Sequence, residues 1–501
     1  MTRTAAEVGA GLAPARPARA IRPGERIHVV GVAGAGASAA ALHAHWAGAI
    51  VTGCDPGGPS PYTPALEAEG IPLAWAHDPD HVSAEPHPDR LAVTKALTAV
   101  SPDHPELAAA HRLAIMTEPW QQVVADAAFG RTLVAIAGTH GKSTTAGWLT
   151  HILAAAGTDP SAFVGALLPG SITGAFPATA RRGSGNVFVV EADEYAGNFD
   201  VFWPDLVAIT NIDWDHPDVF ADRAAVLSTF QDWLKRTPES TLVGNVGDSG
   251  FAELFERVRR RPGKTVRAAV VSDDVSLHED VLLEVMGVGP DRTRVELYGV
   301  GHALSVPIEL PTAGHHNVAN AVMVAATARE LGLNSSEIAL GLTTFPGIGR
   351  RLELKGEAAG IAVYDDYGHH PTAIRATLEA LRQREPGRRV WAAYEPLTYH
   401  RTAALLDAFA TVLSTADGVA VADIWAGRDP DTSVASAAEL AEAVRAKRPG
   451  LVAEATGSVE GTATWLADHV APGDVVLVMG GGRSYQIGEN LLETLRARLI
   501  T

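Results

Sequence analysis

Cysteine is nearly absent from this sequence of 501 residues, in which Cys54 is the only one. A single cysteine excludes an intrachain disulfide and a zinc site built from several cysteines, and it indicates a reducing, cytoplasmic compartment. No apolar run is long enough to span a bilayer, so we expect no membrane insertion. Residues 1–25 are rich in Ala, Arg and Pro and lack the apolar centre of a secretory signal, which predicts a disordered tail.

Positive charge is also scarce relative to negative charge. The chain has 40 Lys and Arg residues against 58 Asp and Glu residues, a formal net charge of −18. A protein that binds nucleic-acid phosphates needs a basic face, so we expect no nucleic-acid partner. Hydrophobic residues make up 47% of the sequence and charged residues 20%, which is a globular composition, and the length predicts about three domains.

Three α/β units follow one another along the chain. The first opens with an apolar strand, a Gly-rich turn and an Ala-rich helix at 38–47, and the second opens with a strand at 132–137. The third follows a hinge at 343–349 that contains Pro and two Gly residues. We predict an α/β protein with a Rossmann-like domain at 26–131, a central P-loop-type domain with a mainly parallel sheet at 132–348, and a Rossmann-like domain at 349–501.

The strongest chemical signal lies between the strand at 132–137 and the helix that follows it. The loop and the first helical turn consist of Gly138, Thr139, His140, Gly141, Lys142, Ser143 and Thr144. Backbone N–H groups of such a loop favour phosphate, Lys142 is expected to reach the β- and γ-phosphates, and Ser143 is expected to hold Mg²⁺. The spacing G-x-x-G-K-S differs from the usual P-loop, but its place between a buried strand and a helix predicts ATP or GTP binding.

Polar side chains follow the next two predicted strands. Glu191 opens an acidic segment after the strand at 187–190, and His216 lies in a polar segment after the strand at 206–210. The carboxyl ends of parallel strands meet at one edge of a sheet, so these segments are candidates for one or two metal ions around the phosphates. A solvated acidic loop and a structural histidine are the alternatives.

A second glycine-rich turn lies near the start of the chain. Residues 31–36 follow the pattern G-x-x-G-x-G, whereas the dinucleotide fingerprint is G-x-G-x-x-G. Asp55 follows the next strand, where a ribose-binding acid would stand. These residues favour a Rossmann-like unit that binds a diphosphate. The second half of a dinucleotide domain is missing from the sequence, which argues against an NAD oxidoreductase.

Taken together, these segments resemble the Mur ligase family over residues 26–500. The resemblance is carried by 138–145, 191–194, 316–320 and 350–353, and it is most specific in the block 364–371. It implies an ATP- and Mg²⁺-dependent ligase that activates a carboxylate as an acyl phosphate and joins it to an amino acid. It further implies UDP-N-acetylmuramate and L-alanine as the substrates, in the synthesis of a peptidoglycan precursor.

The resemblance also implies roles for individual residues. Those expected at the UDP-sugar are Gly34, Ala35, Gly36 and Asp55. Those expected at ATP are the loop residues 138–144 together with Asn317, Asn320, Arg350 and Asp366. The expected metal ligands are Ser143, Glu191 and His216. The expected catalytic residues are Lys142, His216, His370 and Arg401, the last two to orient the acceptor or to stabilise charge.

The third predicted domain departs from the family pattern. Glu395 stands where Gln is typical and Leu397 where His is typical. Arg428 stands where an acid is usual, and Arg483 follows two glycines where the family tends to have Gly-Asp. All of these residues lie in the domain that would bind the incoming amino acid, so they leave its identity more open than the nucleotide.

Other functions stay open at this stage. The nearest is a recycling ligase that joins UDP-N-acetylmuramate to a tripeptide, followed by a diverged amide ligase that uses another carboxylate. From other classes, a P-loop ATPase switch predicts hydrolysis without a UDP-sugar, and a nucleotide sensor predicts binding without turnover. We expect a monomer or a homodimer.

Overall fold

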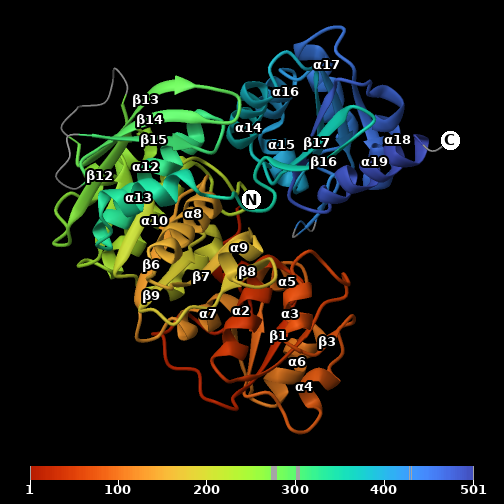
Figure 1. The fold of residues 1–501 in the computed structure, drawn as a ribbon. Helices are drawn as coiled ribbons and strands as arrows, with labels where there is room; N and C mark the ends of the chain where they lie inside the picture. Colours follow the sequence, from red (N-terminus) through yellow and green to blue (C-terminus); the bar gives the residue numbers. More distant parts are fainter. Residues whose placement is uncertain (1, 272–278, 301–304, 428, 430, 500–501) are drawn as a thin grey trace.

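The computed structural model describes residues 2–271, 279–300, 305–427, 429 and 431–499. Three sheets follow one another along the chain, each within its own domain (Figure 1). The N-terminal domain lies at the bottom of the view in Figure 1, the central domain at the left and the C-terminal domain at the upper right. The predicted three-domain α/β architecture is confirmed.

The N-terminal sheet is parallel throughout, with the order β3-β2-β1-β4-β5. Its strands are β1 (Arg26–Val30), β2 (Ile50–Cys54), β3 (Leu73–Ala74), β4 (Arg90–Val93) and β5 (Met116–Pro119). Its helices are α2 (Ala35–Trp46), α3 (Pro64–Ala68), α4 (Asp80–Ser83), α5 (Lys95–Thr98), α6 (Pro105–Arg112) and α7 (Trp120–Ala127). This is the strand order of a Rossmann fold without its sixth strand, so the predicted Rossmann-like character is confirmed. Strands β4 and β5 belong to a second half, which the sequence analysis did not find.

Helix α2 is packed between two sheets. One side contacts its own sheet at β1 and β2, and the other contacts β7 and β8 of the central domain. Five of its alanines are buried, and small side chains allow the backbone to approach both sheets closely. At its centre His43 Nε2 lies 3.0 Å from the carbonyl oxygen of Ala162, and Ser38 Oγ lies 3.1 Å from Thr179 Oγ1. The first two domains therefore share one apolar core.

The central sheet has the order β15-β14-β13-β12-β11-β10-β6-β9-β7-β8. It is parallel from β13 to β7 and antiparallel at both ends, where β14, β15 and β8 add to it. Its strands are β6 (Thr132–Ala137), β7 (Ser161–Leu168), β8 (Ala178–Arg181), β9 (Val187–Glu191), β10 (Leu206–Ile209), β11 (Thr241–Asn245), β12 (Thr265–Val270), β13 (Val281–Val288), β14 (Thr293–Tyr298) and β15 (Val306–Leu310). Its helices are α8 (Lys142–Ala155), α9 (Gly170–Thr173), α10 (Arg223–Arg236), α11 (Ser249–Val258), α12 (His315–Glu330) and α13 (Ser335–Thr343), with a 3₁₀ helix η1 (Tyr195–Val201).

Strand β6 is buried on both faces, which explains its continuous apolar sequence. Leu133 and Ala135 belong to the core on one side of the sheet, and Val134 and Ile136 belong to the core on the other. Because β9 and β10 run parallel to β6 on either side, the three strands end at one edge of the sheet. That edge carries the predicted phosphate loop and both predicted metal-binding segments.

The C-terminal sheet has the order β16-β17-β21-β18-β19-β20, parallel except for the β16–β17 pair. Its strands are β16 (Glu353–Ala358), β17 (Ile361–Asp366), β18 (Val390–Glu395), β19 (Gly418–Ala422), β20 (Ala453–Gly457) and β21 (Val475–Gly480). Its helices are α14 (Pro371–Arg384), α15 (Tyr399–Ala404), α16 (Leu406–Leu413), α17 (Ala437–Lys447), α18 (Val459–His469) and α19 (Tyr485–Arg498).

The N-terminal tail differs from the disordered segment that its composition predicts. It contains the helix α1 (Ala5–Val8), and Arg16 donates to Glu118 and Asp126 at 3.0 and 2.7 Å. Arg3 donates to Asp218 of the central domain at 3.1 Å. The tail is held by carboxylates that lie about a hundred or more residues further along the chain, which composition cannot reveal.

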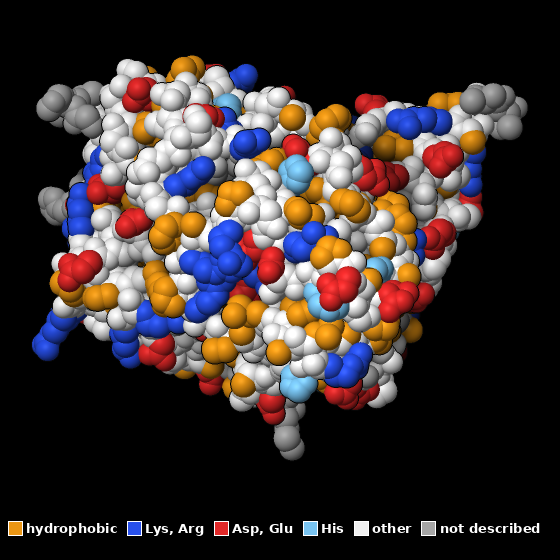
Figure 2. Space-filling model, turned by 90° about the horizontal axis from the view of Figure 1, so that it is seen from below, with side chains coloured by type: hydrophobic (Ala, Val, Ile, Leu, Met, Phe, Trp, Pro, Cys, Tyr) orange, Lys and Arg blue, Asp and Glu red, His pale blue; other side chains and the backbone are white. Residues whose placement is uncertain are grey.

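The surface carries charge of both signs. Figure 2 shows acidic and basic side chains interspersed over the lower face, with one compact group of Lys and Arg near its middle. This face therefore has no continuous basic surface of the kind that phosphate-backbone binding requires. Within the described part of the chain, none of the helices has the length and apolar character needed to cross a membrane.

Candidate active site

The phosphate loop connects β6 to α8 through two glycines with positive φ. Gly138 has φ 124° and Gly141 has φ 80°, in the region that favours glycine. A Cβ atom on Gly141 would lie 2.3 Å from Oδ1 of Asn320, so the loop packs directly against α12. Next to it, the His140 N–H donates to Asn211 Oδ1 at 2.8 Å, which ties the loop to the segment after β10.

Lys142 lies at the first position of α8 and points toward the acidic segment after β9. Its Nζ is 3.1 Å from Glu194 Oε2 and 3.4 Å from Asp193 Oδ1. Burial on its own lowers the pKa of Lys142, but the carboxylates of Glu194 and Asp193 raise it more, so the pKa lies above its ordinary value. The ammonium is therefore charged and held at the helix N-terminus, where it can meet an anion.

Ser143 connects the phosphate loop to the end of β9 and to the C-terminal domain. Its Oγ donates to Glu191 Oε1 at 3.0 Å and accepts from Arg351 Nη2 at 2.9 Å. The other Glu191 oxygen accepts the Gly165 N–H at 2.6 Å, which fixes the carboxylate. His216 lies beside a second group: its ring nitrogen and carboxylate oxygens of Asp193 and Glu194 lie within 4.8 Å of one another.

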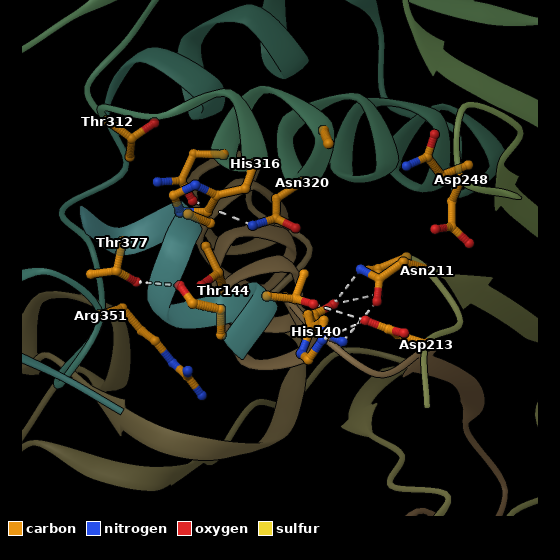
Figure 3. A pocket seen from close by; sticks show the side chains of 18 of the residues that line it. His140, Thr144, Asn211, Asp213, Asp248, Thr312, His316, Asn320, Arg351 and Thr377 are labelled. Carbon is orange, nitrogen blue, oxygen red and sulfur yellow. Dashed lines mark hydrogen bonds and ion pairs between the residues drawn. The ribbon is translucent and has the colours of Figure 1, made fainter. Parts of the chain in front are cut away.

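Two cavities meet at the phosphate loop. The first, of about 440 Å³, lies between α8, α12 and the C-terminal domain, and Figure 3 shows His316 and Asn320 of α12 facing it across from Arg351 and Thr377. The second, of about 340 Å³, is walled by Ala35 and Gly36 of the N-terminal domain, by Lys142, Ser143 and Glu191 of the central domain, and by His369 and Arg401 of the C-terminal domain. Because His140, Gly141 and Arg351 line both cavities, the loop forms their common wall.

The C-terminal domain reaches over the phosphate loop through a buried arginine. Arg401 Nε and Nη2 lie 2.9 and 2.8 Å from Asp215 Oδ1, and Nη2 lies 3.1 Å from His216 Nδ1. Burial raises the pKa of Asp215, but the Arg401 guanidinium outweighs it and holds that pKa well below its usual range. This ion pair, across 186 residues of sequence, joins the two domains in a closed arrangement.

Two adjacent histidines of the C-terminal domain have different surroundings. His370 caps α14 by accepting the Thr372 N–H at Nδ1, and its Nε2 lies 3.1 Å from the carbonyl oxygen of Trp214. Both of its ring nitrogens are thus engaged. His369 Nδ1 lies 2.9 Å from the Tyr367 carbonyl oxygen, and its Nε2 lies 3.9 Å from Asp215 beside the second cavity. Burial lowers the pKa of His370 to about 4 and that of His369 well below its usual value.

The structure gathers most of the predicted site residues around the loop. Asn317, Asn320, Thr144 and Asp366 line the first cavity, and Ala35, Gly36, Thr139, Glu191, His216, His370 and Arg401 line the second. Gly34 lies at the N-cap of α2. Asp55 accepts the N–H groups of Ala33 and Gly57, so its carboxylate holds the backbone of the loop.

One predicted nucleotide residue points elsewhere. Arg350 is buried in the C-terminal domain, where it donates to Asp365 Oδ2 at 3.0 Å and to the Gly480 carbonyl at 2.9 Å. Its neighbour Arg351 lines both cavities instead. Sequence reasoning missed Arg351, Asp215 and Glu194 as site residues. The signal available was their position beside predicted ones, in the segments 350–353, 211–218 and 191–194.

The departures in the third domain occupy different places. Leu397 lines the second cavity and lies next to Gly481. Glu395 is buried nearby, and burial raises its pKa to about 7 against the opposing N–H groups of Ser484 and Arg483. Arg483 is exposed and pairs with Glu460 at 3.2 Å. Arg428 lies outside the described residues.

Models of three family domains match consecutive parts of the chain. They are the Mur ligase family catalytic domain at residues 26–131, the Mur ligase middle domain at 136–328, and the Mur ligase glutamate ligase domain at 350–482. The chain belongs to the Mur ligase family. The resemblance inferred from the sequence is thereby confirmed.

Curated relatives cover this Mur ligase almost from end to end. The UDP-N-acetylmuramate–L-alanine ligase of Frankia casuarinae is 35% identical, and the match covers 94% of this chain and 98% of the relative. The ligase of the same name from Kineococcus radiotolerans is 37% identical, and the match covers 94% of this chain and 97% of the relative.

Solved structures share the fold of this Mur ligase. The UDP-N-acetylmuramate–alanine ligase of Thermotoga maritima has a TM-score of 0.75 at 22% identity and covers 94% of this chain and 99% of its own. A murein peptide ligase from Psychrobacter arcticus has a TM-score of 0.72 at 23% identity with the same coverage. At such identities the likeness concerns the fold alone, and it is nearly equal for the two kinds of ligase.

Proposed function

We propose that this Mur ligase joins L-alanine to the lactyl carboxylate of UDP-N-acetylmuramate in an ATP-dependent reaction, and so forms a peptidoglycan precursor. The observation that carries the proposal is the second cavity, to which all three domains contribute. Ala35 and Gly36 come from the domain expected to bind the UDP-sugar, Lys142 from the phosphate loop, and Arg401 from the domain expected to bind the amino acid. The relatives that match nearly the whole chain carry the name of this reaction.

ATP is proposed to occupy the first cavity, with its phosphates directed at the loop. A volume of about 440 Å³ lies within the range of small-molecule binding pockets. Asn317 and Asn320 line it from α12, and the buried carboxylate of Asp366 lines it from the C-terminal side. The Lys142 ammonium and the α8 N-terminus would receive the terminal phosphate at the common wall of the two cavities.

Mg²⁺ fits the donors at this wall, since Ser143 and Glu191 offer hard oxygen ligands close together. When bound, Mg²⁺ would neutralise charge on the phosphates. Ser143 and Glu191 are proposed to hold one ion, and His216 with Asp193 and Glu194 a second. The carboxylates that now pair with Lys142 would then be shared between the ammonium and the metal.

The proposed reaction has two steps. A lactyl carboxylate oxygen attacks the γ-phosphorus of ATP, the bond to the β-phosphate oxygen breaks, and ADP leaves behind an acyl phosphate. The neutral amine of L-alanine then attacks the acyl carbon, the amine loses a proton, and inorganic phosphate leaves as the amide forms. Lys142 stabilises the transferring phosphoryl group, and Arg401 holds the closed arrangement that excludes water from the acyl phosphate.

His369 is proposed to accept the proton of the attacking amine, in preference to the predicted His370. The ring of His370 is engaged at both nitrogens, so it positions α14 against the Trp214 carbonyl. His369 Nδ1 is held by the Tyr367 carbonyl, which leaves Nε2 as the acceptor on the cavity side. Burial lowers its pKa, so the ring is neutral at physiological pH, and the Asp215 carboxylate 3.9 Å from Nε2 offsets the positive charge that the ring gains with the proton.

The test is phosphate release from the purified full chain with ATP, Mg²⁺ and UDP-N-acetylmuramate, with and without L-alanine. L-alanine-dependent release and a product heavier by one alanyl residue are expected. Release with a tripeptide but not with L-alanine would show that the tripeptide is the acceptor. Leu397, which borders the cavity, would then be the residue to test for this choice. Release of phosphate without any UDP-sugar, at the same rate, would contradict the ligase assignment in favour of an ATPase.

A further inference from the structure

A buried cluster of histidine, cysteine and glutamate lies in the N-terminal domain, away from the reaction cavities. His28 is on β1, Cys54 ends β2, His81 is on α4 and Glu106 is on α6. One ligand atom from each of these four residues lies within 4.8 Å of the others. We propose that the cluster binds one zinc ion, which joins the two short helices to the sheet.

Two of the distances between the ligand atoms match those of a tetrahedral site, and a third is shorter. Cys54 Sγ lies 3.4 Å from His28 Nε2 and 3.2 Å from Glu106 Oε1. Zinc with bonds of about 2.0–2.3 Å at tetrahedral angles separates its ligand atoms by about 3.3–3.6 Å. His81 Nδ1 and Glu106 Oε1 lie 2.7 Å apart, so this pair has to open by less than an ångström to admit the ion.

Burial and charge favour a metal over a set of neutral hydrogen bonds. Cys54 and Glu106 are completely buried, and His28 is only 2% exposed. A divalent cation with one thiolate, one carboxylate and two neutral imidazoles has no net charge, which suits an interior of low dielectric. A thiolate together with imidazoles selects zinc-like ions over Mg²⁺ or Ca²⁺.

The surroundings orient the ligands as metal sites require. His28 Nδ1 lies 2.8 Å from Thr52 Oγ1, which leaves Nε2 turned toward Cys54. Glu106 Oε1 also accepts the Asp78 N–H at 3.0 Å. Glu106 also lies close to His104, since ligand atoms of the two residues are within 4.8 Å of each other. His104 is 5% exposed, and its Nδ1 has no hydrogen-bond partner among the described residues. A second imidazole, His77, packs against it with ring centroids 4.3 Å apart.

The cluster is separate from the proposed reaction. Side chains alternate along β1, so Ile27 and Val29 face the core shared with the central domain, whereas His28 and Val30 face α4 and α6. The site therefore acts on the stability of the N-terminal domain. Helix α4 has four residues and α6 has eight, and a metal ion that ligates both would hold them where short helices alone are marginal.

The decisive measurement uses the full chain after removal of any affinity tag. We expect one zinc ion per chain by elemental analysis. After removal of zinc by a chelator and addition of cobalt(II), we expect a near-ultraviolet thiolate-to-cobalt charge-transfer band. Because Cys54 is the only cysteine, such a band reports this site alone and is not produced by a metal at the phosphate loop.

Variants sharpen the test. Cys54→Ser should abolish the band, and His81→Asn should lower the metal affinity by about 100-fold or more. His111→Ala, an exposed histidine on the same helix as Glu106, is the matched control and should keep both zinc and band. A tag-free wild-type protein without stoichiometric zinc, whose zinc-free form gives no band with cobalt(II), would overturn the proposal even if the variants do not fold.

Discussion

The two glycine-rich turns of this protein share a backbone plan and differ in the side chains that follow. Each connects a buried parallel strand to a helix through a glycine with positive φ, Gly31 at 81° and Gly141 at 80°. Helix α8 then begins with Lys142 and Ser143, whereas α2 begins with Ala35 and Gly36. The plan alone provides N–H groups for an anion. From this difference we infer that the side chains in the first turn of the helix decide whether a bound phosphate is only held or is also transferred.

The largest expected effect comes from Lys142, which the first glycine-rich turn of the chain lacks. Lys142→Ala should lower turnover by about 10³-fold or more, because the ammonium is the fixed positive charge at the transferring group. Steady-state phosphate release measures the effect, with Lys235→Ala on the exposed face of α10 as the control. Turnover near that of the wild type would mean that Lys142 does not distinguish the phosphate loop from the first glycine-rich turn.

Glu191 tests the metal side of the same turn. Glu191→Gln removes charge from the oxygen that accepts from Ser143 but preserves its shape, so the Mg²⁺ concentration for half-maximal activity should rise by about 10–100-fold. The measurement is a Mg²⁺ titration at saturating ATP. An unchanged titration, with Asp193→Asn shifted instead, would move the ligand to the neighbouring acid.

A matched pair of glycine variants separates the two turns from each other. Gly141→Ala brings a Cβ to 2.3 Å from Asn320, and Gly36→Ala brings one to 2.1 Å from the Trp120 ring. We expect a roughly tenfold rise in the KM for ATP in the first variant and for the UDP-sugar in the second, each leaving the other substrate nearly unchanged. Equal effects on both substrates in either variant would show that the turns are not independent.

Glu395 lies outside both turns and gives the smallest expected effect, on stability. Burial raises its pKa to about 7, so the unfolded chain ionises first as the pH rises, and the fold loses stability between about pH 4.5 and 7. Glu395→Gln should therefore be nearly neutral at pH 4.5 and stabilising by roughly 1–2 kcal/mol at pH 8, since the buried amide has its own desolvation cost. Urea unfolding at the two pH values measures this, and a gain that is equal at both would contradict the raised pKa.

Local sequence was enough to predict the phosphate loop. Strand β6, the two glycines and the start of α8 are adjacent in the chain, so one short segment of sequence contains every part of the loop. The roles of the individual site residues stay predictions. The residue pairs that hold the domains together could not be predicted, because Arg401 contacts Asp215 across 186 residues and Arg351 contacts Ser143 across 208. No periodicity or composition encodes such pairs, and the same holds for the contact of His28 with Cys54 and Glu106.

The N-terminal tail is a second case in which contacts distant in sequence could not be predicted. Its Ala, Arg and Pro content predicted disorder, whereas Arg16 and Arg19 find buried carboxylates at Asp126 and Glu25. An arginine with a fixed partner is ordered whatever the composition around it.

The order of synthesis determines when the tail can form its contacts. Residues 2–25 leave the ribosome before the partners of Arg16 at residues 118 and 126, and before the partner of Arg3 at residue 218. Domains generally fold as units from the N-terminus during synthesis. This segment therefore reaches its final contacts only after the first domain and part of the second have emerged, and it then connects the two.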